Sequence, residues 1–194
     1  MDKKRLLIGI SGASGAPIAA ELLKQLKLYS DQIETYLILT KGGKMTLSQE
    51  TSLTQEDLHN LADKVYDNSN IGDAPASGSY KTMGMIVVPC SMKTLAGIVS
   101  GYSDNLLLRA ADVTLKERRK LVLVPRECPL STLHLRNMYE VSQLGAVILP
   151  PVLSYYNHPE SLADCTSHIV GKIMDQFDLE STGFKRWEGM DALS

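Results

Sequence analysis

The sequence of 194 residues contains few aromatic residues and few cysteines. Aromatic residues make up 6% of the chain, which suits an aliphatic parallel sheet covered by helices better than an aromatic-rich sandwich. The three cysteines, Cys90, Cys128 and Cys165, are widely spaced, form no C-x-x-C motif and have no histidine at ligand spacing. We therefore expect neither a disulfide framework nor a zinc site.

The sequence also lacks an excess of charge and a long apolar segment. Its 20 basic side chains nearly balance 22 acidic ones, and no basic patch with interleaved aromatic residues occurs, so a nucleic-acid partner is not expected. The longest apolar runs, such as MIVVP and LVLVP, are too short to span a bilayer, and the N-terminus leads into a strand instead of a cleavable signal. These features predict a cytoplasmic protein without a membrane partner.

Short apolar runs rich in β-branched residues alternate with segments of helical periodicity. Strands are expected at residues 4–10, 33–40, 84–89, 120–125 and 146–149. Helical patterns occupy residues 17–28, 54–66, 104–119, 131–145 and 158–177, with Asp104, Ser131 and Ser161 as expected N-caps. This alternation predicts an α/β fold with a mostly parallel sheet, formed by one domain over residues 1–194 with a helical tail from about residue 159. Residues 67–83 are expected to form a long loop.

The first expected strand leads into a glycine-rich segment, RLLIGISGASGAP, with glycines at positions 9, 12 and 15. The segment does not end in Gly-Lys-Ser/Thr, so it is not a Walker A loop, and its G-x-x-G spacing departs from the dinucleotide fingerprint. Pro17 is acceptable in the first turn of a helix. We expect the loop to offer backbone N–H groups to a phosphate. In the alternative interpretation, the glycines serve only a tightly packed turn.

Polar residues follow nearly every expected strand, at the edge where parallel strands end and ligands bind. They are residues 11–15, Thr40 with Lys41, residues 89–94, and Arg126 with Glu127. A NAD-binding protein places an acidic residue after the second strand to hold the ribose diol, whereas this chain has Thr40. The pattern therefore favours a mononucleotide such as FMN.

Two further segments are rich in chemically active residues. Arg109 and Lys116 lie two helical turns apart on one face, and Arg109 follows an apolar run, so it is expected to point inward toward an anionic partner. Lys116 could equally belong to a solvated face. Residues 155–158 form a polar aromatic loop, and Trp187 is the single tryptophan of the chain.

The chain resembles a known family in several of these motifs: GISGASGAP, PCSMKTLAGI, RAADVTLKERRKLVLVPRE, HLRNM, GAVILPPV, DQF and RW. The resemblance is to the flavin prenyltransferases, UbiX-like proteins formerly described as aromatic-acid decarboxylases or their small subunits. It implies a three-layer, flavodoxin-like and Rossmann-like fold. It also implies transfer of a dimethylallyl group from dimethylallyl monophosphate to reduced FMN without a metal, which yields prenylated FMN for a UbiD-like decarboxylase. Relatives form large homo-oligomers with sites at subunit contacts.

The resemblance also assigns roles to individual residues. The implied FMN contacts are Gly12, Ala13, Ser14, Thr40, Ser91, Met92, Lys93, Thr94 and Arg126. The implied prenyl-phosphate site comprises Tyr156, Lys172, Arg109, Lys116 and Trp187. The implied catalytic residues are Glu127, Glu50, Ser14 and Lys116. Glu127 is expected to protonate the departing phosphate, and Tyr156 or Trp187 to present an aromatic face to the allylic cation.

Two other functions remain open at this stage. An FMN-dependent decarboxylase of the cysteine-decarboxylase superfamily would share the fold, but it needs a substrate-clamping Asn after the fifth strand, which PPVLSYYN matches poorly. A non-catalytic, flavin-carrying accessory subunit of an aromatic-acid decarboxylase is the second alternative. The flavin product made from reduced FMN and dimethylallyl monophosphate would separate all three.

Overall fold

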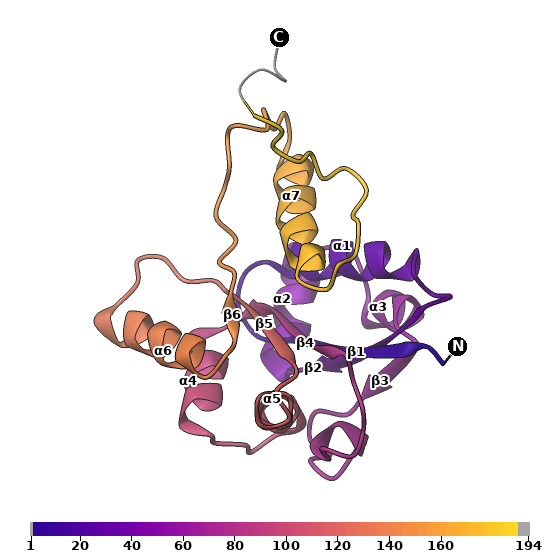
Figure 1. Ribbon diagram of the computed structural model, residues 1–194, viewed down its shortest axis with the longest axis vertical. Coiled ribbons are helices and arrows are strands. Elements are labelled where there is room, and N and C mark those ends of the chain that lie inside the picture. The colour runs from indigo at the N-terminus through magenta and orange to yellow at the C-terminus, as the bar shows by residue number, and fades with distance from the viewer. Residues whose placement is uncertain (1, 190–194) are drawn as a thin grey trace.

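Six parallel strands form the central layer of the molecule (Figure 1). The computed structural model describes residues 2–189. The strands are β1 (Lys4–Ile10), β2 (Ile33–Leu39), β3 (Lys64–Tyr66), β4 (Gly84–Cys90), β5 (Lys120–Pro125) and β6 (Val147–Ile148). Their order in the sheet is β3-β2-β1-β4-β5-β6. This is the Rossmann order, and without the short edge strand β3 it becomes the flavodoxin-like order. The predicted fold class is confirmed, with every strand pair parallel.

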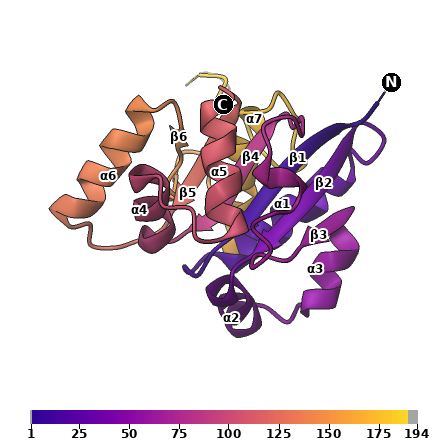
Figure 2. The same ribbon diagram turned by 90° about the horizontal axis from the view of Figure 1, so that it is seen from below.

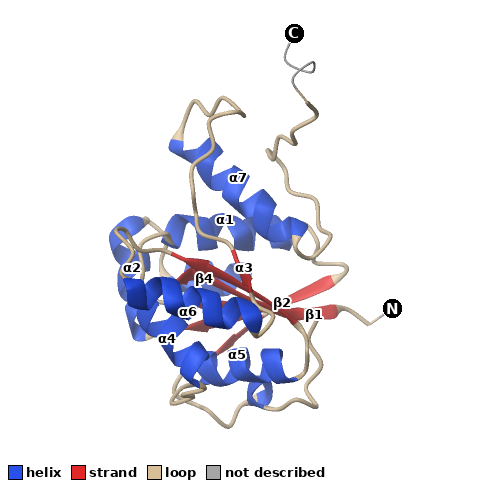
Figure 3. Ribbon diagram, turned by 60° about the vertical axis from the view of Figure 1, so that its left-hand side comes forward, coloured by secondary structure: helices blue, strands red, loops and turns tan. Residues whose placement is uncertain are grey.

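Helices cover both faces of the sheet (Figures 2 and 3). They are α1 (Ala16–Lys27), α2 (Lys41–Glu50), α3 (Gln55–Leu61), α4 (Met92–Ser100), α5 (Leu106–Lys116), α6 (Thr132–Gln143) and α7 (Leu162–Asp175), with a 3-10 turn η1 (Ala74–Ala76). Helices α1, α2, α3 and α7 share one apolar core with the sheet, and α4, α5 and α6 share the other. No helix within residues 2–189 is long and apolar enough to cross a bilayer.

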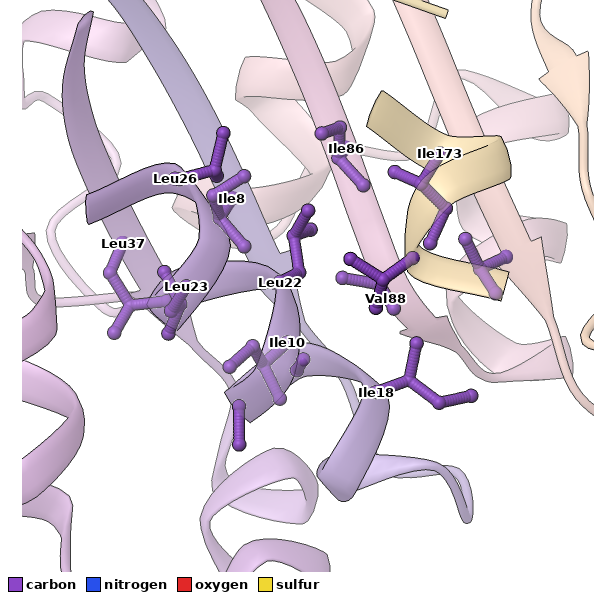
Figure 4. Packing of buried hydrophobic residues seen from close by; sticks show 14 of the residues in the cluster. Ile8, Ile10, Ile18, Leu22, Leu23, Leu26, Leu37, Ile86, Val88 and Ile173 are labelled. Atoms are coloured by element: carbon purple, nitrogen blue, oxygen red, sulfur yellow. The ribbon is translucent and has the colours of Figure 1, made fainter. Parts of the chain in front are cut away.

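The strands contribute side chains to both cores, because successive side chains of a strand point to opposite faces of the sheet. Ile8 and Ile10 of β1 join the core under α1 and α7, whereas Leu7 joins the opposite core. Figure 4 shows Ile8 and Ile10 with Leu22 of α1, and Val88 of β4 close to α7. These four side chains are all buried. This double burial explains why the strand sequences are continuous apolar runs.

Most expected elements are present, with some corrections at their ends. Ser131 and Ser161 cap α6 and α7 as predicted, because each side chain accepts a hydrogen bond from the N–H three residues later. The expectation that Asp104 caps α5 was wrong. The cap is Asn105, whose side chain accepts the N–H of Leu108 at 3.1 Å.

Two elements did not follow from the sequence pattern. Helix α2 was not predicted, since only Gly43 and Leu47 of its ten residues are buried and it has no apolar stripe. The helix expected over residues 54–66 ends at Leu61, and the chain then forms the edge strand β3. The expected long loop over residues 67–83 contains only η1.

Candidate functional site

Strands β2 and β3 lie on one side of β1, and β4, β5 and β6 lie on the other, so the strand order switches between β1 and β4. In such sheets a ligand binds in the crevice beyond the carboxyl ends of the two strands at the switch point. Ser11 joins these two strand ends. Its hydroxyl donates to the carbonyl of Pro89 at 2.9 Å and accepts from the N–H of Ser91 at 2.8 Å. Ser11 is buried, so this bridge fixes the spacing between the loop after β1 and the start of α4.

Two helices begin at this edge with hydroxyl caps. Thr40 accepts from the N–H of Gly43 at 3.0 Å at the start of α2. Ser91 accepts from the N–H of Thr94 at 3.2 Å at the start of α4 and donates to the hydroxyl of Thr94 at 3.0 Å. The positive ends of both helix dipoles therefore face the crevice, which favours an anion there.

The loop after β1 and the start of α2 approach each other so closely that side chains would not fit. A Cβ on Gly12 would lie 2.9 Å from the Cα of Gly42, and one on Gly43 would lie 2.4 Å from the carbonyl oxygen of Ile10. These glycines bring backbone groups from two segments to the crevice without side chains between them. A backbone cradle beside two helix N-termini fits the phosphate of a mononucleotide such as FMN.

Glu50, the last residue of α2, binds the N-terminus of α1. Its Oε2 accepts the N–H groups of Gly15 at 2.8 Å and Ala16 at 2.9 Å. Burial opposes its ionisation, but hydrogen bonds from Gly15, Ser14 and Ala16, with the nearby charge of Arg126, hold the pKa of Glu50 below its usual value. A carboxylate of the chain itself therefore takes two N–H groups at the start of α1, and the expected contact between a phosphate and the remaining N–H groups of the loop stays a prediction.

A cavity of about 420 Å³ opens beside Glu50, between α1, α7 and the strand ends. Its polar lining comes from Ser14, Glu50 and Arg126. The rest of its wall is largely apolar and consists of Gly15, Pro17, Ile18, Pro151, Leu153, Leu162, Cys165, Thr166 and Ile169. An apolar cavity with a few polar groups suits a flat aromatic ring system or an isoprenoid chain.

Glu127 and three of the expected FMN contacts, Ala13, Met92 and Lys93, lie at the same sheet edge but outside this cavity. Glu127 follows β5 directly, is exposed, and accepts the N–H of Cys128 at 3.1 Å with its own Oε1. Met92 and Lys93 form the first turn of α4. Ala13 is held in the loop by a hydrogen bond from its N–H to the carbonyl of Ser11 at 3.0 Å.

Tyr156, Lys172 and Trp187 do not line the cavity at Glu50. Tyr156 and Trp187 pack edge to face with ring centres 5.5 Å apart, and both line a second cavity of about 220 Å³. Lys172 is exposed on α7, one turn beyond the buried His168. Trp187 therefore packs against Tyr156, although its side chain is 47% exposed.

Arg109 and Lys116 form a third group, on α5 and the opposite face of the sheet. Arg109 is half-buried and pairs with Asp112 through Nη1 and Oδ2 at 2.6 Å, which supplies its expected anionic partner. Lys116 pairs with Glu117 just before the amino end of β5, a strand of six residues, or roughly 20 Å. One chain therefore does not bring Lys116 to the cavity beyond the carboxyl end of β5.

Reasoning from the sequence missed two residues beside these groups, Cys165 in the first cavity and His168 next to Tyr156. His168 lies on the apolar face of α7, so the sequence pattern did not indicate its polar contact with Tyr156. Within the described part of the chain, no group of three or more His, Cys, Asp or Glu residues is arranged to hold a metal ion.

Comparisons with known proteins identify relatives over almost the whole chain. The family model described as Flavoprotein matches residues 1–177. A "Probable UbiX-like flavin prenyltransferase" of Sedimentibacter hydroxybenzoicus is 55% identical over 185 residues, which are 95% of this chain and 97% of that protein.

Two solved structures are also similar throughout. The first is described as a dodecameric FMN-dependent UbiX-like decarboxylase from Escherichia coli O157:H7, with 48% identity, a TM-score of 0.93, and coverage of 95% of this chain and 100% of that one. The second is AnUbiX (PadA1) in complex with FMN and dimethylallyl pyrophosphate, with 45% identity, a TM-score of 0.93, and coverage of 97% and 99%. Two solved structures described as cysteine decarboxylases, EpiD and SpaF, match at 16% and 15% identity, which shows the fold alone.

Proposed function

The chain belongs to the UbiX-like flavin prenyltransferases, and from this membership we infer that it is an enzyme that transfers a dimethylallyl group to reduced FMN. The observation that carries this conclusion is the 55% identity to such a protein over 95% of the chain. Two features at the same sheet edge support the proposal: the glycine cradle at the start of α2 suits a phosphate, and the apolar cavity beside Glu50 suits a flavin ring. The product, prenylated FMN, serves a UbiD-like decarboxylase.

The chain's own residues must bind FMN, neutralise a departing phosphate and keep water from an allylic cation. We assign the FMN phosphate and ring to the segments around Gly12, Thr40 and residues 91–94, with Arg126 at the cavity. Bound reduced FMN supplies the nucleophilic ring positions that accept the prenyl group. Glu127 donates a proton to the departing phosphate, and Ser14 and Glu50 orient the reacting ring. Tyr156 and Trp187 present aromatic faces to the developing cation.

The donor is proposed to be dimethylallyl monophosphate. A monophosphate carries up to about two negative charges at neutral pH, which Lys116, Arg126 and Lys172 can balance without a metal ion. The related structure AnUbiX contains dimethylallyl pyrophosphate, so the two phosphates have to be compared directly on this chain. We expect the monophosphate to react faster.

We propose further that the complete site lies between copies of this chain. A single chain leaves the three groups of expected residues apart: the cavity at Glu50, the aromatic group at Tyr156, and Arg109 with Lys116 on α5. Large apolar side chains are exposed on α6 and after β6, where a second copy could bury them. They include Leu133, Leu135, Tyr139, Val152, Leu153, Tyr155 and Leu162. The related structure from Escherichia coli O157:H7 is described as dodecameric, which supports assembly of this chain.

The test is to incubate the protein anaerobically with reduced FMN and dimethylallyl monophosphate in EDTA, and to measure the flavin by mass spectrometry. We expect a flavin heavier by one C5H8 unit, formed without added magnesium. An unchanged flavin would contradict the function, and strict dependence on magnesium would contradict the account of the donor. A parallel reaction with the diphosphate determines donor preference.

Matched reactions separate the two alternative functions. Given oxidised FMN, a cysteine decarboxylase would release carbon dioxide from a peptide with a C-terminal cysteine, pass the electrons to the flavin and add no prenyl group to it. An accessory subunit would bind FMN but catalyse neither reaction. Dimethylallyl alcohol, which lacks the phosphate leaving group, serves as the negative control.

A further inference from the structure

His168 lies between two residues assigned to the prenyl phosphate. It is 7% exposed on α7, with its Nε2 3.4 Å from the Tyr156 hydroxyl. Lys172 follows one helical turn later on the same helix. His168 is therefore placed to control which way the Tyr156 hydroxyl points.

Aromatic packing holds the imidazole in place. Tyr156 meets it edge to face with ring centres 5.7 Å apart, and Phe184 packs on it at 5.2 Å. Gly171 leaves room for Phe184, because a Cβ at this position would lie 2.3 Å from the Phe184 ring. Within residues 2–189, the buried Nδ1 of His168 has no hydrogen-bond partner. The tyrosine hydroxyl is thus the only polar group of this region with which the ring pairs.

A neutral imidazole carries one proton, and its position decides the role of Tyr156. With the proton on Nδ1, a buried N–H would lack an acceptor, which is rare in proteins, and the Tyr156 hydroxyl would have to donate to Nε2. The Tyr156 oxygen would then present only its lone pairs to a phosphate, with no proton to donate. With the proton on Nε2, the imidazole donates to the Tyr156 oxygen, and the hydroxyl proton remains available for a phosphate oxygen.

We propose that His168 is a positioning residue whose Nε2–H donates to Tyr156, so that the Tyr156 hydroxyl donates its own proton to the phosphate of the prenyl donor. The proposal rests on the function proposed above. Burial and, to a smaller extent, the charge of Lys172 lower the pKa of His168 and keep the ring neutral. The hydrogen bond is long, so it orients the hydroxyl and still lets it turn toward a ligand.

Two substitutions of His168 separate the hydrogen bond from the packing. His168→Phe keeps an aromatic ring but removes the donor, and His168→Gln can place an amide N–H near the position of Nε2. Loss of one hydrogen bond to a bound phosphate corresponds to roughly a fivefold to tenfold rise in KM for dimethylallyl monophosphate. We expect this rise in His168→Phe, with unchanged FMN affinity, and recovery of most of the wild-type KM in His168→Gln.

The Tyr156→Phe background tests whether His168 acts through Tyr156. There, adding His168→Phe should cause no further rise in KM, because the hydroxyl that His168 orients is gone. An equal rise in both backgrounds, or a His168→Gln enzyme as impaired as His168→Phe, would overturn the proposal and leave His168 with a packing role.

A spectroscopic readout does not depend on turnover. Solid-state ¹⁵N NMR of protein labelled at its four histidines distinguishes protonated from unprotonated ring nitrogens, and the His168→Phe variant identifies the relevant signals. We expect Nε2 to be protonated and Nδ1 unprotonated at neutral pH. A protonated Nδ1 would refute the proposal even if the enzyme is active. An inactive wild-type enzyme with the expected signals would instead refute the proposed function.

Discussion

At the scale of single residues, Glu50 changes the interpretation of the glycine-rich loop. The spacing of three glycines before a helix predicted N–H groups directed at an external phosphate. In the structure, two of those groups bind a carboxylate that comes from more than 30 positions further along the chain. No local pattern could reveal this contact, because it depends on α2 ending beside the start of α1. Glu50 therefore fixes the loop that we propose contacts FMN.

This arrangement predicts a pH-dependent contribution of Glu50 to stability. A carboxyl whose folded-state pKa is depressed stabilises the protein above its unfolded pKa, about 4.3 for glutamate. That contribution disappears as the pH falls through the lower folded-state value. Glu50→Gln should lower the free energy of unfolding by about 1–2 kcal/mol at pH 7. Urea unfolding should show the difference from wild type narrowing below about pH 4.

The control for Glu50 is Glu56→Gln on α3, which removes a carboxylate from an exposed side chain. Its unfolding free energy should stay within about 0.5 kcal/mol of the wild type. A Glu50→Gln protein as stable as wild type at pH 7, or a difference that does not change in acid, would show that the carboxylate does not hold α1.

Glu127 is predicted to act in the reaction and not in FMN binding. It lies at the carboxyl end of β5 with an exposed side chain, so a ligand can reach it. Glu127→Gln keeps the shape but cannot donate a proton to the departing phosphate. We expect about a hundredfold or greater loss of prenyl transfer with unchanged FMN affinity. Stopped-flow measurement of the bound flavin follows the chemical step, and unchanged rates would exclude Glu127 from it.

At the scale of elements, the buried strands were predictable, whereas the short edge strand β3 was not. Strands β1, β2, β4 and β5 are continuous apolar runs because both of their faces are covered. Strand β3 has three residues, and its Lys64 is exposed, so its pattern merges with the preceding helix. Helix α2 carries two glycines where a helix usually carries strong helix formers. Its glycines allow the close contact with the loop after β1. Helix propensities cannot predict such a contact, because it involves a segment distant in the sequence.

Gly43 provides the test of this contact. Gly43→Ala would place a Cβ 2.4 Å from the Ile10 carbonyl oxygen, a backbone atom that cannot move without shifting β1. We expect a loss of about 1–3 kcal/mol in the free energy of unfolding and weaker FMN binding, despite the better helix propensity of alanine. Thermal unfolding and fluorescence titration with FMN measure the two effects.

The matched control for Gly43 is Gly72→Ala in the loop before η1. The nearest atom to a Cβ at Gly72 is 3.7 Å away, which is ordinary contact. Gly72→Ala should therefore leave stability and FMN affinity close to the wild type. Equal behaviour of the two variants would mean that the approach of α2 to β1 is not constrained by the absence of a side chain.

At the scale of the whole molecule, sequence similarity assigned to one site residues that do not lie together within a single chain. The motif-based assignment placed Lys116, Glu127 and Tyr156 in one site without indicating which copy supplies each. Lys116 precedes β5 and Glu127 follows it, so the length of that strand separates them within a chain. Distances between residues along a strand can be predicted from the sequence, whereas the surfaces that meet in an assembly cannot. A further proposal at this scale is that residues 1–194 form a single flavoprotein domain.

A site shared between copies predicts that two inactive variants restore each other. In a mixed assembly of Lys116→Ala and Glu127→Gln chains, some sites receive an intact Lys116 from one chain and an intact Glu127 from another. With equal amounts and random closed assembly, about a quarter of the sites should be intact. Co-expression with two affinity tags, sequential purification and measurement of prenylated FMN give this fraction.

The control pairs Arg126→Ala with Glu127→Gln. These neighbours end the same strand of the same chain, so every site should keep one defect and activity should stay at the level of the parents. If the first pair also stays at that level, Lys116 does not complete the site of another copy, and its pairing with Glu117 on the surface of α5 becomes its sufficient explanation.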